Sequence, residues 1–286
     1  MCRGSQRCRS ARALVYDRAM AHQCILAQRD GAVLRVTLNR PDKLNALNLQ
    51  LVTELAEVAA DVRWDGTVRA VLLTGSGRAF CTGADLKDSA LSGEPGKPAG
   101  AHVAHTMRTV INPMIQHWYR LPVPVVVAVN GMVTGAGISL ALAGDIVVAT
   151  ESASFSLPFI PRLGIIPDLG ATFSLPQRIS AARVSGLALL GEPISARMAA
   201  EWGLIWASVG DDAFNAHATA LSHRLASAPT RAIVAMKTLL ADGPGQSLEA
   251  QLEREAQIQG ALADTQDFQE GMGAFRDKRD PKFEGR

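Results

Sequence analysis

Two glycine-rich turns hold the backbone groups of this chain that are best placed for chemistry. Residues 82–86 and residues 130–137 each follow an apolar run typical of a buried strand. Small side chains let a ligand approach the backbone, and the first N–H groups of a helix lie at the positive end of its dipole. The N–H groups of Ala84 and Ala136 could therefore converge on one oxygen and stabilise a developing negative charge. A tight packing turn is the alternative for either segment.

A carboxylate that could act as a general base is Asp168. It stands in an apolar stretch with Ile165, Ile166 and Leu169, and Phe159 lies just upstream. An apolar setting disfavours the charged form and raises the pKa of a carboxyl toward the range in which a base works. Because a helical pattern follows directly, Asp168 could instead be a helix N-cap, a role that aspartate favours. The sequence leaves both interpretations open.

These residues must be positioned by a sheet followed by helices, which predicts an α/β fold. Strands are expected at 23–28, 33–39, 69–73, 125–129, 146–149 and 153–156. Asn48 is expected to cap a helix that runs to about residue 62, and a second helix is expected at about 102–119. From about residue 170 the pattern is helical. Ligands bind at the carboxyl ends of strands in open α/β sheets, which is where both turns fall.

Composition excludes several classes of protein. With 286 residues, 48% of them hydrophobic, the chain is long enough for one large domain with a helical appendage. The net charge of +2 comes from arginines in residues 1–19, and the remainder is near neutral, so neither nucleic acid nor membrane is an expected partner. Residues 121–144 carry no charge, but their prolines and glycines argue against a membrane-spanning helix.

The first 19 residues are interpreted as a leader outside the fold, because a normal domain opening begins at Met20. Their arginine-rich, acid-poor composition also resembles a mitochondrial transit peptide. None of the four cysteines forms a Cys-x-x-Cys pair, and His102 and His105 lack a third ligand, so no metal site is expected. We expect a cytoplasmic protein, or a protein of the mitochondrial matrix if the transit peptide is genuine.

Four segments, in order, resemble the crotonase superfamily of enoyl-CoA hydratases and isomerases. They read Leu-Asn-Arg-Pro and Leu-Asn-Ala-Leu within 38–47, Gly-Ala-Asp-Leu-Lys at 83–87, Asn-Gly followed by Gly-Ala-Gly within 130–137, and Glu-Gly-Met followed by Ala-Phe and Lys-Arg within 270–279. The resemblance spans about residues 22–284. It implies a spiral of ββα units over residues 20–225 and a C-terminal helical trimerisation region over 226–286, in a homotrimer or a dimer of trimers.

The resemblance also implies an acyl-CoA substrate, with coenzyme A as part of that substrate rather than a separate cofactor. Its thioester oxygen would bind between the N–H groups of Ala84 and Ala136. Lys87, and Lys278 of a neighbouring subunit, would meet the phosphates of coenzyme A, while Asp85 is expected to hold its loop. The full set of implied substrate-binding residues is Lys43, Leu44, Ala46, Gly83, Asp85, Leu86, Lys87, Gly135, Phe159, Phe275 and Lys278.

The positions at which this sequence differs from the hydratases of the family indicate the type of reaction. Hydratases of the family use two glutamates, whose positions are Ser139 and Phe159 here, and neither side chain can do that acid–base work. In Δ3,Δ2-enoyl-CoA isomerases and phenylacetate-pathway ring isomerases, a carboxylate stands at the position of Asp168. We therefore predict an enoyl-CoA isomerase that shifts a double bond. A hydratase, an aromatic acyl-CoA dehalogenase or hydrolase, and a non-catalytic binding protein are the alternatives.

Overall fold

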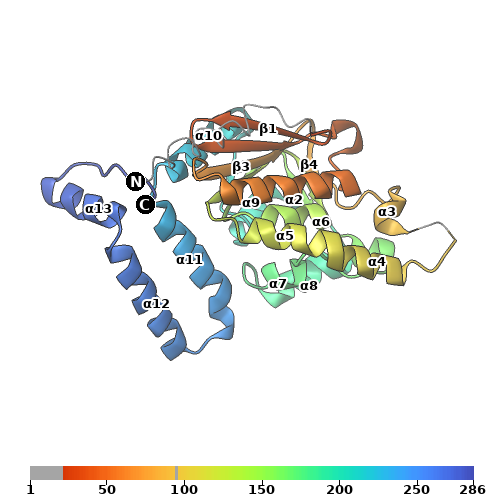
Figure 1. The fold of residues 1–286 in the computed structure, drawn as a ribbon. Coiled ribbons are helices and arrows are strands. Elements are labelled where there is room, and N and C mark those ends of the chain that lie inside the picture. Colours follow the sequence, from red (N-terminus) through yellow and green to blue (C-terminus); the bar gives the residue numbers. More distant parts are fainter. Residues whose placement is uncertain (1–21, 94–95) are drawn as a thin grey trace, which may run out of the picture.

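Two sheets form the centre of the molecule (Figure 1). The computed structural model describes residues 22–93 and 96–286, so the predicted leader at 1–19 lies outside the described residues. The larger sheet has the strand order β1 (Ile25–Asp30), β2 (Val33–Leu38), β3 (Ala70–Gly75), β5 (Val125–Val129), β7 (Ile146–Thr150) and β10 (Ala207–Val209). The smaller sheet has the order β4 (Ala79–Cys81), β6 (Met132–Thr134), β8 (Ser154–Ser156) and β9 (Ile194–Ser195).

The chain alternates between these sheets as it proceeds. β3 continues into β4, β5 into β6, and β7 into β8, so each turn of the chain adds one strand to each sheet. β3, β5 and β7 pair in parallel, as do β4, β6 and β8, whereas β1–β2 and β8–β9 are antiparallel. This arrangement confirms the predicted spiral of ββα units. It also places the carboxyl ends of β4, β6 and β8 side by side.

Helices cover both faces of the larger sheet. On one side, α2 (Leu49–Trp64) packs against α5 (Asn112–Tyr119), and the indole N–H of the buried Trp118 donates to the Leu55 carbonyl of α2 at 3.0 Å. Asn48 caps α2 as expected, since its side chain accepts from the Leu51 N–H at 3.0 Å. On the other side, α10 (Asp211–Ala226) buries its apolar residues against β3, β5 and β7.

Shorter elements connect these layers. They are η1 (Pro41–Lys43), α3 (Ser89–Ser92), α4 (Gly100–Thr106), the π-helical η2 (Met107–Ile111), α6 (Ala136–Leu142), the π-helical η3 (Phe159–Leu163), α7 (Ala171–Ser174), α8 (Ala181–Leu190) and α9 (Ala196–Glu201). α4, η2 and α5 follow one another directly, where the sequence predicts one helix.

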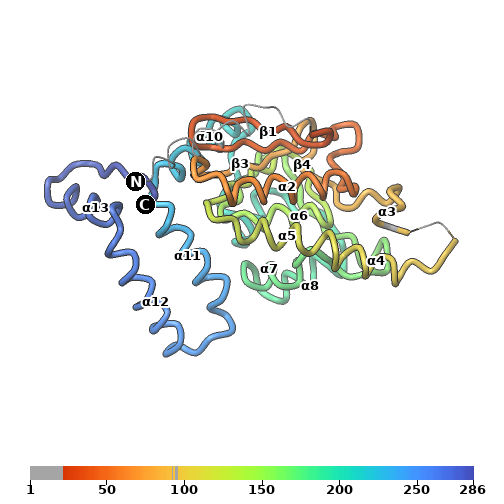
Figure 2. Tube along the Cα trace, in the orientation of Figure 1, coloured from red at the N-terminus to blue at the C-terminus, as the bar shows by residue number. Residues whose placement is uncertain are grey.

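The C-terminal helices lie to one side of the sheets. α11 (Thr230–Asp242) and α12 (Leu248–Ala263) run in opposite directions, joined by η4 (Gly243–Gly245), and α13 (Gln266–Asp277) follows (Figure 2). Neither α11 nor α12 has a buried residue within this chain, and both expose large apolar side chains, namely Met236, Leu240, Leu248 and Leu252. The domain boundary predicted at 226 stays a prediction, although α10 ends at that residue.

Sequence reasoning misplaced or missed several strands. The first strand begins and ends two residues later than the 23–28 predicted. The short strands β4, β6, β9 and β10 were not predicted, because two or three residues are too few to show an alternating pattern. Consequently, residues 82–86 follow β4 rather than β3, and the segment 130–137 contains β6, so that Gly135 and Ala136 follow β6 rather than β5.

Candidate active site

The two glycine-rich turns lie against each other at the carboxyl ends of β4 and β6. Gly83 has a φ of +88°, and a methyl group built on it would lie 3.4 Å from the Ala136 nitrogen and 3.1 Å from the Thr134 carbonyl oxygen. Gly135 has a φ of +57°, which an L side chain rarely adopts. Glycine at both positions therefore allows the backbones that carry Ala84 and Ala136 to approach closely.

The N–H groups of both alanines lack a hydrogen-bond acceptor among the described residues. Leu47 donates to the Gly83 carbonyl at 2.8 Å and accepts from the Asp85 N–H at 2.8 Å, so the N–H of Ala84 between them faces away from Leu47. Ala136 is the first residue of α6, where an N–H has no intrahelical partner. Within the described part of the chain, neither N–H donates a hydrogen bond. The pair can serve as an oxyanion hole.

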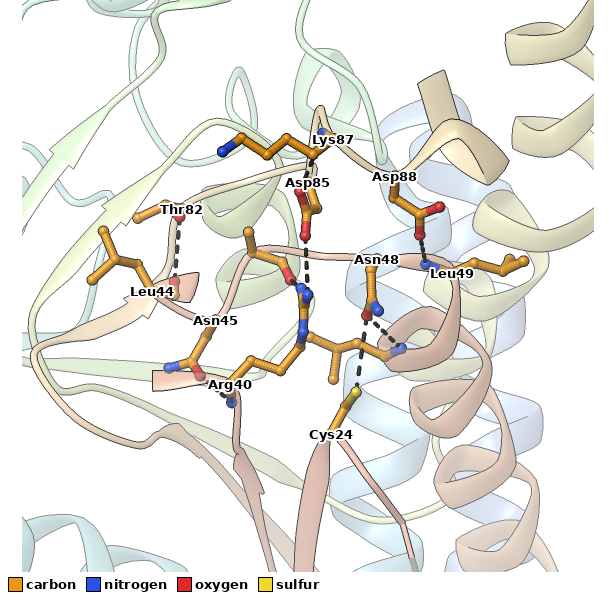
Figure 3. A network of polar contacts seen from close by, with 12 residues as sticks. Cys24, Arg40, Leu44, Asn45, Asn48, Leu49, Thr82, Asp85, Lys87 and Asp88 are labelled. Carbon is orange, nitrogen blue, oxygen red and sulfur yellow. Dashed lines mark hydrogen bonds and ion pairs between the residues drawn. The ribbon is translucent and has the colours of Figure 1, made fainter. Parts of the chain in front are cut away.

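A polar network braces the first of these turns (Figure 3). The Arg40 guanidinium donates to Asp85 Oδ2 at 3.0 Å and also to the Ala46 carbonyl. The Asn45 side chain accepts from the Arg40 N–H at 2.8 Å and donates to the Ala79 carbonyl at 2.8 Å. The Leu44 carbonyl accepts from the backbone N–H of residue 82 at 3.2 Å. Residues 40–46 are thereby fixed against residues 79–86.

Asp85 is part of this brace. Partial burial opposes its ionisation, but hydrogen bonds from Arg40 and from the Lys87 N–H outweigh that effect and hold the pKa of Asp85 below its ordinary value. The carboxylate is therefore ionised and engaged on both sides. These contacts support a structural role for Asp85 in holding the Ala84 loop.

Asp168 lies between η3 and α7. Its backbone carbonyl accepts two hydrogen bonds, from the Ser139 hydroxyl of α6 at 2.8 Å and from the Ala171 N–H at 2.9 Å. Its carboxyl atom Oδ1 is buried and has no hydrogen-bond partner among the described residues. Burial raises the pKa of Asp168 from 3.8 to about 6, against a smaller lowering effect of its own N–H. A carboxylate in this state can act as a base near neutral pH.

The N-cap interpretation of Asp168 is wrong. The N-cap of α7 is Gly170, and no side chain makes a capping hydrogen bond there. The chain reaches α7 through two consecutive left-handed residues, Leu169 with a φ of +49° and Gly170 with a φ of +80°. The Asp168 side chain thus precedes the helix without capping it.

The apolar surroundings of Asp168 differ in part from those predicted. Leu169 and Phe159 are buried, but Ile165 and Ile166 are 52% and 71% exposed and do not enclose the carboxyl within this chain. A methyl group built on Gly135 would lie 3.3 Å from the Phe159 ring, so this ring packs over the second turn. The wall next to the Ala136 N–H is therefore aromatic and apolar.

The other predicted binding residues fall into two groups. Lys43, Leu44 and Ala46 belong to the bracing segment, and Leu86 and Lys87 are exposed beside the first turn. Phe275, which is 86% exposed, and Lys278 lie at the end of α13, away from both turns (Figure 1). A single chain does not bring this second group to the site.

Sequence reasoning missed a set of polar side chains near the Asp168 segment. Tyr119 of α5 is 4.0 Å from a methyl group built on Gly170, and burial raises the pKa of its hydroxyl. The Arg178 guanidinium donates to the carbonyls of Leu142 and Gly144 at 2.9 and 3.0 Å, which ties the end of α6 to the region after α7. These residues come from separate segments with no shared spacing, so no sequence signal marks them.

Other types of site receive no support. In residues 22–93 and 96–286, no group of three or more His, Cys, Asp or Glu side chains could hold a metal ion. Burial raises the pKa of Cys81 to about 12, which keeps this thiol protonated and unreactive. No helix in the same ranges combines the length and the apolar character that crossing a bilayer requires.

Comparison with known proteins identifies the family of this chain. The family model described as "Enoyl-CoA hydratase/isomerase" matches residues 28–286. The chain is 41% identical to "1,2-epoxyphenylacetyl-CoA isomerase" of Escherichia coli, covering 92% of this chain and 98% of that protein. It is 44% identical to "Probable enoyl-CoA hydratase" of Rhodobacter capsulatus, covering 88% and 94%.

A solved structure shows the same fold. The crystal structure of an enoyl-CoA hydratase from Bacillus anthracis superposes with a TM-score of 0.84 at 34% identity, covering 92% of this chain and all of that chain. Paired turns at the carboxyl ends of the smaller sheet, the spiral of ββα units and these similarities lead to one conclusion. The chain belongs to the enoyl-CoA hydratase/isomerase family, the crotonase superfamily.

Proposed function

We propose that this protein is an isomerase that shifts a carbon–carbon double bond in an enoyl-CoA thioester. The observation that carries the proposal is the carboxyl of Asp168, whose Oδ1 atom is buried without a hydrogen-bond partner among the described residues and whose pKa is raised to about 6. Its backbone is linked through Ser139 to the helix that begins at Ala136. One base next to an oxyanion hole is all that such a shift requires.

The reaction moves one proton and consumes no other reactant. The thioester oxygen of a 3-enoyl substrate binds between the N–H groups of Ala84 and Ala136. The Asp168 carboxylate takes a proton from C2, and the resulting negative charge is delocalised onto the thioester oxygen, where both N–H groups stabilise it. The carboxylic acid then returns the proton to C4, so that the double bond lies between C2 and C3.

Two side chains disfavour the addition of water. Hydration needs groups that activate a water molecule and protonate carbon. The hydroxyl of Ser139 is buried and already donates to the Asp168 carbonyl, and Phe159 presents an apolar ring over Gly135. The relatives do not separate the two reactions, because one is named an isomerase and another a hydratase.

Substrate binding is proposed to involve more than one subunit. The exposed apolar residues of α11 and α12 support packing against another copy of the chain, in the homotrimer or dimer of trimers that the sequence predicts. In such an assembly, Phe275 and Lys278 would reach the coenzyme A of a neighbouring site. Lys87 would meet the coenzyme A phosphates from the subunit that holds the thioester.

Incubation with matched substrates tests the proposed reaction. The protein is supplied separately with 3-enoyl-CoA and 2-enoyl-CoA esters of several chain lengths, and with ring-bearing analogues. Chromatography with mass detection follows isomers and water adducts in the same sample. We expect isomerisation of at least one 3-enoyl ester, with water addition much slower. Hydration of a 2-enoyl ester at a rate equal to or above isomerisation would contradict the proposal.

A further inference from the structure

Ser139 links the two halves of the candidate site. It lies in α6, its side chain is fully buried, and its hydroxyl donates to the backbone carbonyl of Asp168 at 2.8 Å. α6 begins at Ala136, so Ser139 lies three residues further along the helix, slightly less than one turn and about 4.5 Å along the helix axis. The same short helix thus carries an oxyanion donor and the contact that holds the backbone of the base.

The backbone that Ser139 holds is an unusual one. Directly after Asp168, Leu169 adopts a φ of +49°, and Gly170 adopts a φ of +80°. A left-handed residue other than glycine costs free energy and persists only where the surrounding contacts impose it. The bonds from Ser139 and from the Ala171 N–H both end on the Asp168 carbonyl, immediately before this strained residue.

We infer that Ser139 is a positioning residue, whose hydroxyl fixes the Asp168 carboxyl relative to the Ala136 N–H. This inference rests on the proposed function, in which both groups act on one thioester. Ser139 does not touch the reacting atoms in this scheme. Its removal is expected to loosen residues 167–170 and to let water reach the carboxyl.

The surroundings of Asp168 make its pKa a direct readout of that change. Burial is the main cause of the raised pKa, its own N–H opposes it, and no charged side chain contributes. The titratable group packed near the segment is Tyr119 of α5, and beyond it lies the buried guanidinium of Arg178. A loosened segment should therefore lower the pKa of Asp168 toward its ordinary value of 3.8.

The test compares three variants in the full-length protein. Ser139→Ala removes the hydroxyl, and Ser139→Thr retains it. Ser222→Ala is the matched control, because Ser222 is also fully buried in a helix and its hydroxyl donates to a backbone carbonyl, that of Ala218, at 2.8 Å. The pKa of Asp168 is measured by ¹³C NMR titration, with Asp168→Asn assigning the signal. The kcat and KM for a 3-enoyl-CoA ester are measured in parallel.

Ser139→Ala is expected to lower kcat about 10- to 100-fold, the loss expected of a misplaced catalytic group, with KM changed less than twofold. It should also lower the pKa of Asp168, whereas Ser139→Thr and Ser222→Ala should leave that pKa unchanged. A Ser139→Ala protein with the original kcat and Asp168 pKa would overturn the inference, as would one that only unfolds more easily.

A further variant covers the case in which Ser139→Ala does not fold. Ser139→Cys keeps the volume and leaves a weak thiol donor, so smaller changes in the same direction are expected. Unchanged kcat and pKa in that variant would overturn the inference. Failure of the proposed function can be distinguished from failure of this inference. If the proposed function is wrong, Asp168→Asn keeps its turnover, whatever the NMR titration of the Ser139 variants shows.

Discussion

Replacing Asp168 by Asn should make the stability of the protein depend differently on pH. Burial raises the pKa of Asp168 from 3.8 to about 6 in the folded protein. A carboxyl whose folded pKa is raised stabilises the fold in its protonated form, and this contribution is lost as the pH rises through the folded pKa. Asparagine does not titrate, and therefore removes the cost of an ionised, buried carboxyl at high pH.

The size of this effect follows from the two pKa values. A rise from 3.8 to about 6 corresponds to about 3 kcal/mol over the whole titration. About 2 kcal/mol of this falls between pH 4.5 and pH 8, since the unfolded chain is already mostly ionised at the lower pH. The free energy of unfolding of Asp168→Asn, relative to that of the original protein, should therefore be about 2 kcal/mol higher at pH 8 than at pH 4.5, so the variant is relatively more stable at pH 8.

Urea unfolding at a series of pH values measures this difference. Asp211→Asn is a matched control with the opposite sign, because hydrogen bonds from Thr150 and Ser152 lower the pKa of Asp211. That variant should lose relative stability as the pH rises to about 4, and the difference should then stay nearly constant between pH 4.5 and pH 8. A constant difference between Asp168→Asn and the original protein across the range would refute the argument that Asp168 has a raised pKa.

Three further predictions concern the oxyanion hole, its brace and the assembly. Ala136→Pro removes one N–H and should lower kcat about 10²- to 10³-fold in a protein whose circular dichroism is unchanged, whereas Ala136→Gly should stay within tenfold. Arg40→Met removes the side-chain partner of Asp85 and should lower the free energy of unfolding by about 1–3 kcal/mol, measured in urea. Deletion of residues 265–286 should weaken oligomer formation, measured by light scattering, and coenzyme A binding, measured by calorimetry. A monomeric variant that binds coenzyme A normally would contradict this prediction.

The fold was predictable where the sequence carries a periodic or turn signal. The all-valine-and-alanine strand at 125–129 and the cap at Asn48 appear as expected. The strands of the smaller sheet were mostly not predictable, because their pairing partners, rather than their own three residues, determine them. Yet these strands place the two turns next to each other.

The candidate site was predictable in its residue types and less so in its supports. The turns at Ala84 and Ala136 are recognisable from small residues after apolar runs. Arg40 stands in a recognised motif, but its contact with Asp85 joins residues that are 45 positions apart. Similarly, the sequence indicates only that Ser139 stands at a position where hydratases of the family have a glutamate. Its hydrogen bond to the Asp168 carbonyl is visible only in the structure.

Turnover by Asp168→Asn tests the central claim most directly. The variant keeps the shape of the side chain and cannot accept a proton from C2, so kcat for a 3-enoyl-CoA ester should fall about 10²-fold or more. The original protein should lose activity as the pH falls below about 6, where its carboxyl becomes protonated, and the residual activity of the variant should lack this dependence. Turnover by Asp168→Asn close to that of the original protein would show that Asp168 is not the base.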